Sequence, residues 1–140
     1  MSEKIKPPAA APCASCPYRQ DIPSGVWTEH EYRKLVDYDD PTALQPIGVF
    51  MCHQQDGRLC AGWVGCHDMN HNLAIRFAGM EGVLSQDDFD KALDYETSVP
   101  LFSSGAEAAQ HGMEEIEDPG PAARKIIDTL VQKRLRKESA

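Results

Sequence analysis

The sequence predicts an α+β domain, mostly helical, in which a metal ion joins a short β-hairpin to a looped Cys-x-x-Cys segment. Two observations predict the elements: apolar residues recur at helical spacing in several short segments, and Asp56-Gly57 separates two short apolar runs. The third observation is the presence of five cysteines, an odd number, in a chain of 140 residues. Together with the absence of a secretory signal, this number favours metal binding over a disulfide framework.

Length and composition bound the organisation of the chain. With 140 residues, 41% of them hydrophobic and 26% charged, it has the size and composition of one globular domain. Prolines and alanines dominate the start, which we expect to be disordered. The expected division is a lead-in at 1–12, a single metal-binding domain at 13–136 made of a cysteine and histidine region (13–80) and a helical region (81–136), and a tail at 137–140.

Charge and hydropathy argue against two classes of partner. No segment has the apolar run of a signal peptide or of a membrane span, so we expect a cytoplasmic protein without membrane contact. The net charge is −8, but residues 124–140 carry six basic and two acidic side chains, which leaves −12 on the rest of the chain. Because an acidic body repels phosphate backbones, we expect no general nucleic-acid binding, and the expected partner is another protein.

Capping signals and apolar spacing place the helices. Thr28-x-x-Glu31 is a capping box, in which the two side chains satisfy backbone N–H groups at a helix start, and it predicts a helix over 29–37. The clearest amphipathic pattern, with Ile126, Ile127 and Leu130 on one face, comes last. The other expected helices cover 69–79, 86–95, 105–113 and 122–140.

The hairpin is predicted between residues 47 and 64. Residues 47–52 and 59–64 are short apolar runs, and an Asp-Gly pair between them is typical of a tight turn. The two predicted strands carry Cys52 and Cys60.

Four of the cysteines have the spacing of a metal site. Cys13 and Cys16 form a Cys-x-x-Cys pair, and Cys52 and Cys60 supply a second pair from the hairpin. Four thiolates satisfy a tetrahedral zinc ion, and the free energy of metal binding becomes folding free energy for a small core. A [4Fe–4S] cluster is the alternative cofactor, because four thiolates also satisfy its ligand requirement.

Other side chains are alternate ligands. His53 follows Cys52 directly, and in a strand the two point to opposite faces, which disfavours both as ligands of one ion. Cys66, His67 and His71 form a rival cluster, whose simpler interpretation is helix capping and solvent exposure.

The sequence excludes one catalytic interpretation of the Cys-x-x-Cys segment, a zinc deaminase, and disfavours a second, a thiol oxidoreductase. Zinc deaminases require a His-x-Glu or Cys-x-Glu before Pro-Cys-x-x-Cys, and neither precedes Cys13. A thiol oxidoreductase places the motif after a strand and at a helix start, and no strand is predicted before it. A closed set of four thiolates also leaves no position for an activated water, so we do not expect hydrolysis. An enzyme that uses His53, His67 or Asp68 beside the metal is a third possibility, for which the sequence indicates no substrate.

The segments "PCASCPYRQDIPSGVW", "FMCHQQDGRLCAGW" and "GCHDMNHNLAIR" resemble a family of small proteins from actinobacteria and their phages that is classed as a domain of unknown function. The resemblance covers about residues 12–78. It implies that the four cysteines act together, it adds weight to His53, and it implies no known activity. The matching positions are Pro12, Cys13, Cys16, Pro17, Tyr18, Arg19, Cys52, His53, Cys60, Gly62 and Trp63.

The sequence therefore predicts a small cytoplasmic metal-binding protein. Its zinc ion, held by Cys13, Cys16, Cys52 and Cys60, is expected to be structural and to support a partner-binding surface. The alternative is an iron–sulfur or thiol redox protein.

Overall fold

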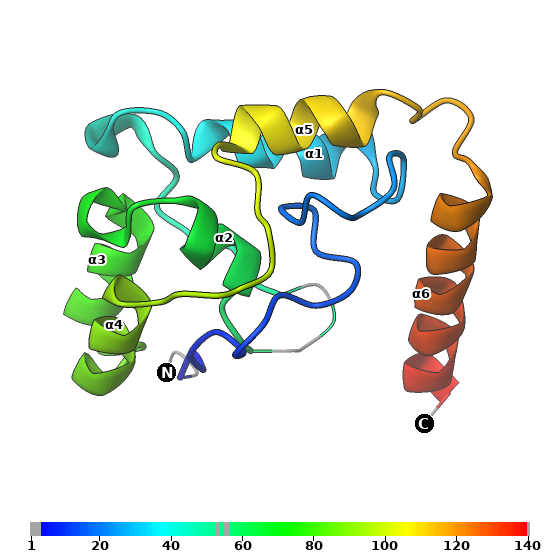
Figure 1. The fold of residues 1–140 in the computed structure, drawn as a ribbon. Coiled ribbons are helices and arrows are strands. Elements are labelled where there is room, and N and C mark those ends of the chain that lie inside the picture. The colour runs from blue at the N-terminus through cyan, green and yellow to red at the C-terminus, as the bar shows by residue number, and fades with distance from the viewer. Residues whose placement is uncertain (1–3, 53, 55–56, 140) are drawn as a thin grey trace.

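The computed structural model describes residues 4–52, 54 and 57–139, and within them the protein is helical (Figure 1). No helix in this part of the chain has both the length and the apolar character needed to cross a bilayer. The α-helices are α1 (Glu29–Asp37), α2 (Ala61–Cys66), α3 (Leu73–Met80), α4 (Gln86–Leu93), α5 (Gly105–Met113) and α6 (Pro121–Ser139), with short 3-10 turns η1 (Thr42–Leu44) and η2 (Met69–His71).

Helices α1 and α5 pack side by side across one edge of the molecule (Figure 1). Their ends agree with the predicted 29–37 and 105–113, because both begin at a side-chain cap: Thr28 Oγ1 accepts from the N–H of Glu31, and Ser104 Oγ from that of Glu107. Asp39, just after α1, accepts from the first two N–H groups of α5 at 2.7 and 2.8 Å. The start of α5 is thereby tied to the end of α1.

The close approach of α1 and α5 requires glycine. A Cβ on Gly112 would overlap the ring of Tyr32, which is 1% exposed. We expect Gly112→Ala to destabilise the protein by about 2 kcal/mol, because the overlap outweighs the better helix propensity of alanine. Urea unfolding measures this, with Gly48→Ala as the control, since a Cβ at Gly48 meets no atom within 4 Å. Equal midpoints for the two variants would contradict the packing described here.

The predicted hairpin is wrong, and with it the α+β class. Residues 50–52 and 58–60 run antiparallel, with the N–H of Cys52 bonded to Arg58 O and that of Cys60 to Phe50 O, both at 2.9 Å, but they meet in a single bridge. The second predicted strand becomes α2 at Ala61. A strand would send neighbouring Trp63 and Val64 to opposite faces, whereas the helix buries both in the core.

The helix predicted over 69–79 is divided. Asp68 caps the 3-10 turn η2, and the Asn72 side chain then accepts from the N–H of Ile75 at 2.9 Å and begins α3. Two capping side chains follow one another, so a 3-10 turn and a helix begin here where a single helix was expected.

The core has two parts of different size. The main core gathers around Trp63, which is fully buried. The second is small: Ile22 and Val26 of the N-terminal loop pack against the first turns of α6. Figure 1 shows α6 standing beside the body, joined to α5 by a long connection. Residues before Cys13 lie against the body, where the N–H of Ile5 bonds Val83 O at 2.7 Å.

Candidate metal centre

Three chain segments bring four cysteines together. Cys13 and Cys16 lie in one tight turn, closed by a 3.0 Å bond from the N–H of Cys16 to Cys13 O. Cys52 and Cys60 lie on the two antiparallel segments that the predicted hairpin was to supply. The single bridge between those segments holds Cys52 and Cys60 next to the Cys-x-x-Cys turn, where each contacts one of its cysteines.

The best-defined contact joins the two buried thiols. Cys16 Sγ lies 3.8 Å from Cys60 Sγ, and the two residues are 1% and 2% exposed. Sulfurs bound at about 2.3 Å to one tetrahedral zinc ion are about 3.8 Å apart, because an edge of the tetrahedron is about 1.6 times the bond length. The separation of this hydrogen-bonded thiol pair equals that of two sulfurs on one zinc ion, so both could bind the same ion without moving apart.

The remaining two thiols form a second pair. Cys13 interacts with Cys52 through a thiol–thiol contact, and burial, followed by the charges of Cys16 and Cys52, raises the pKa of Cys13 to about 12. A hydrogen bond from the Cys60 thiol lowers the pKa of Cys16, and donating that bond raises the pKa of Cys60. Cys13, Cys16 and Cys60 therefore influence one another's protonation, and a bound cation would favour the thiolate form of each.

Backbone N–H groups also point at the buried sulfur. Those of Tyr18 and Gly62 donate to Cys16 and favour its thiolate. Gly62 has no room for a side chain, because a Cβ there would overlap Cys16 Sγ and come within 2.8 Å of Tyr18 Cβ. Glycine two residues after Cys60 thus lets the backbone approach the thiol pair.

Polar side chains hold the Cys-x-x-Cys turn from both sides. Arg19 donates to Pro12 O at 3.0 Å and forms a two-pronged ion pair with Asp21 at 2.7 and 2.8 Å. Ser15, inside the turn, accepts from Trp27 Nε1 through its carbonyl at 2.8 Å and from Gln54 Nε2 through its hydroxyl. Nothing in the local sequence around Ser15 or Gln54 predicts this contact.

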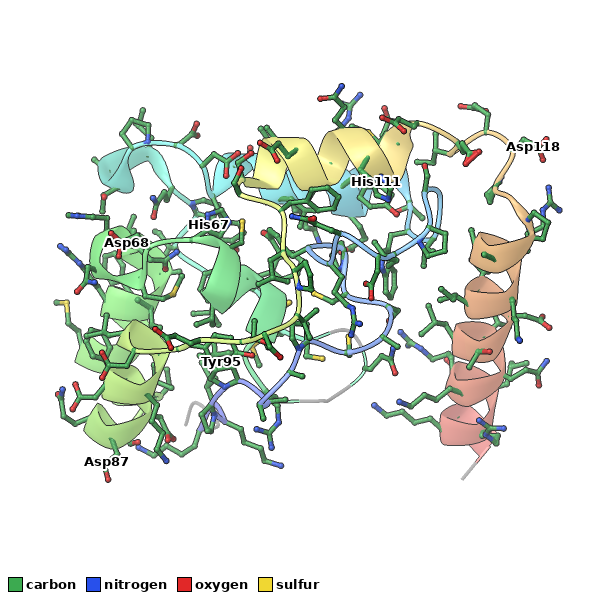
Figure 2. The ribbon with its side chains drawn as sticks, in the orientation of Figure 1. His67, Asp68, Asp87, Tyr95, His111 and Asp118 are labelled. Carbon is green, nitrogen blue, oxygen red and sulfur yellow. The ribbon has the colours of Figure 1, made fainter. Side chains whose placement is uncertain are left out.

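The alternate ligands lie elsewhere or outside the described residues. His53 is one that lies outside them. Cys66, His67 and His71 line a separate cavity of about 360 Å³. His67 is placed beneath α1 and α5 (Figure 2), where its Nε2 lies 3.3 Å from Tyr18 Oη and its Nδ1 3.7 Å from Asp39 Oδ1.

Tyr18 separates that cavity from the four cysteines. The hydroxyl end of Tyr18 meets His67, whereas its Cβ lies beside Gly62 and the thiol pair. Burial, with a smaller contribution from Asp39, raises the pKa of Cys66 to about 12. The rival cluster is therefore a distinct place in the fold.

The thiol cluster is not closed around one centre. Among the described residues, no group of three or more His, Cys, Asp or Glu side chains is already arranged to hold a metal ion. The sulfurs instead form two contacting pairs, Cys16 with Cys60 and Cys13 with Cys52.

The cysteine cluster lies within the part of the chain that matches a domain family. Residues 8–134 match a family of unknown function, DUF6283. The chain belongs to DUF6283. The matched region contains all five cysteines and every helix from α1 to α5. Searches of curated proteins and of solved structures gave no match.

Proposed function

We propose that this protein is a small cytoplasmic metal-binding protein in which Cys13, Cys16, Cys52 and Cys60 hold one structural zinc ion. The observation that carries the proposal is the buried Cys16–Cys60 pair, whose sulfurs are 3.8 Å apart. The second support is Gly62, whose missing side chain leaves the space that Cys16 Sγ fills. Thiolates are the ligands that structural zinc prefers in proteins.

The site is structural because of what it joins. An ion held by all four thiolates has no open position, so it does not activate water. It also connects the Cys-x-x-Cys turn to the two segments around residues 52 and 60, and so adds to the backbone bonds that Lys6 makes with Gly57 and Leu59. The free energy of metal binding then stabilises an N-terminal half that has little regular structure. We propose that the stabilised surface binds another protein.

The alternative, a [4Fe–4S] or thiol redox protein, has less support. In such a cluster each thiolate binds a different iron, so the sulfurs lie farther apart than on a single ion. The 3.8 Å pair fits one ion better. A redox thiol needs a lowered pKa and solvent access, whereas Cys13 has a raised pKa and Cys16 is buried.

Elemental analysis of protein purified without oxygen tests this proposal. We expect a colourless protein with about one zinc ion per chain, as four thiolates on one ion require. A brown protein that contains iron and sulfide in similar amounts would instead establish the cluster.

A pair of serine variants separates the four proposed ligands from the fifth cysteine. Cys66→Ser is expected to leave the zinc content unchanged, because Cys66 lines the separate cavity beyond Tyr18. Cys13→Ser is expected to lower the zinc content strongly, because it removes one of four ligands. Zinc per chain, measured on both variants, checks the assignment; loss of zinc from Cys66→Ser with retention in Cys13→Ser would reverse it.

A further inference from the structure

The C-terminal half of α6, from Leu130 to Lys137 and called its lower half below, borders a groove of about 450 Å³ between this helix and the body. Its apolar lining comes from Trp27 on the loop and from Leu130, Val131 and Leu135 on the helix, and Lys133 and Arg134 add positive charge. The groove offers an apolar floor with a basic edge.

The character of α6 changes along its length. Ile126, Ile127 and Leu130 pack on the second core cluster, so the first turns face the body. Beyond them, Val131 and Leu135 remain 47% and 50% exposed. Figure 2 shows nitrogen-tipped side chains reaching from the lower turns of α6 toward the body. The helix therefore extends beyond the second core cluster, and its apolar side chains in that part are partly exposed.

Charge indicates what this groove binds. Residues 124–140 carry a net charge of +4 in a chain whose remaining residues carry −12. An acidic protein segment is attracted to the basic edge, and an amphipathic one can also cover the apolar floor. The acidic body repels a nucleic acid and an acidic peptide alike, so the apolar floor decides between them: a nucleic acid gains nothing from Val131 and Leu135, whereas an amphipathic segment covers both.

The groove is connected to the proposed zinc site through Ser15, which lies between Cys13 and Cys16. Trp27 Nε1 donates to the Ser15 carbonyl at 2.8 Å, and Gln54 Nε2 donates to its hydroxyl. Gln54 Oε1 in turn lies 3.4 Å from Lys133 Nζ. A metal ion that fixes the Cys-x-x-Cys turn also fixes one wall of the groove.

We propose that the groove between Trp27 and the lower half of α6 binds an acidic amphipathic helix of a partner protein. This inference rests on the proposed function, because it locates the surface that the zinc site supports. The helix places its apolar side chains against Trp27 and Val131 and its carboxylates against Lys133 and Arg134.

Binding of a synthetic peptide tests the proposal. The probe is a labelled peptide of Leu and Glu at helical spacing, and its anisotropy is followed with the zinc-loaded protein. We expect binding that weakens about tenfold or more in K133E/R134E, because two attractive charges become repulsive. The control K125E/R136E changes the same charge at two residues of α6 that do not line the groove, and it is expected to alter the affinity less than about twofold. Equal weakening in both variants would overturn the groove as the site.

Two further probes separate the outcomes. The same peptide with Lys in place of Glu, and a short DNA duplex, are both expected not to bind. Binding of the duplex without binding of the Glu peptide overturns the inference. Zinc-loaded protein that does not bind the Glu peptide also overturns it and leaves the zinc proposal intact. Peptide binding in a protein that holds no metal supports the groove and contradicts the zinc proposal.

Discussion

Cys16→Ser is expected to remove the metal and most of the cooperative unfolding transition. Cys16 is 1% exposed, and its sulfur faces Cys60 at 3.8 Å, so its loss opens the centre of the cluster. The binding free energy of a structural zinc ion is about 10–16 kcal/mol. The free energy of unfolding of a whole domain is of the same size, about 5–15 kcal/mol. Thermal unfolding followed by circular dichroism, together with zinc per chain, measures both losses.

A chelator applied to the wild-type chain provides an independent form of the same test. We expect a strong chelator to lower the melting temperature, and added zinc to restore it, because only the folded state holds the four thiolates together. Cys66→Ser is the control, since it removes a thiol that is half-buried and lies outside the proposed ligand set. If Cys16→Ser melts as Cys66→Ser does and keeps its zinc, the four-cysteine site does not exist.

Gly62→Ala is expected to lower zinc affinity about tenfold or more and to destabilise the fold, although no ligand is changed. The new methyl group would overlap Cys16 Sγ and crowd Tyr18 Cβ, and backbone and buried sulfur have little freedom to move apart. The displacement also lengthens the bond from the N–H of Gly62 to Cys16, which supports the thiolate. Competition with a zinc-binding dye measures the affinity.

The control for that variant lies on the same helix. A Cβ at Gly65 would approach Leu101 Cδ1, the end of a flexible side chain, at 2.7 Å. Gly65→Ala is therefore expected to cost about 1–3 kcal/mol of stability while zinc affinity stays unchanged. Equal zinc affinity in Gly62→Ala and Gly65→Ala would show that close backbone approach plays no part in the site.

The parts of the fold that local chemistry decides were predictable. Thr28 and Glu31 mark the start of α1, and the structure begins that helix at Glu29. The region of α2 was not predictable in this way, because its short apolar run suits a strand as well as a helix. The burial of Trp63 and Val64 against distant segments decides in favour of the helix, and that information is tertiary.

The same division applies to the candidate site. The Cys-x-x-Cys spacing of Cys13 and Cys16 predicts two of the four proposed ligands. In the structure, Cys52 contacts Cys13 and Cys60 contacts Cys16. Sequence spacing could not show that Ser15 connects the turn to Trp27 and α6, because this connection joins residues that are far apart in the chain.

X-ray absorption at the edge of the native metal tests the central claim most directly, because it reports the ligand atoms and their distances. We predict a zinc edge and a first shell of four sulfur atoms at about 2.3 Å, from Cys13, Cys16, Cys52 and Cys60. Nitrogen or oxygen neighbours at about 2.0–2.1 Å in place of a sulfur, or iron neighbours beyond the first shell, would contradict a zinc ion held by four thiolates.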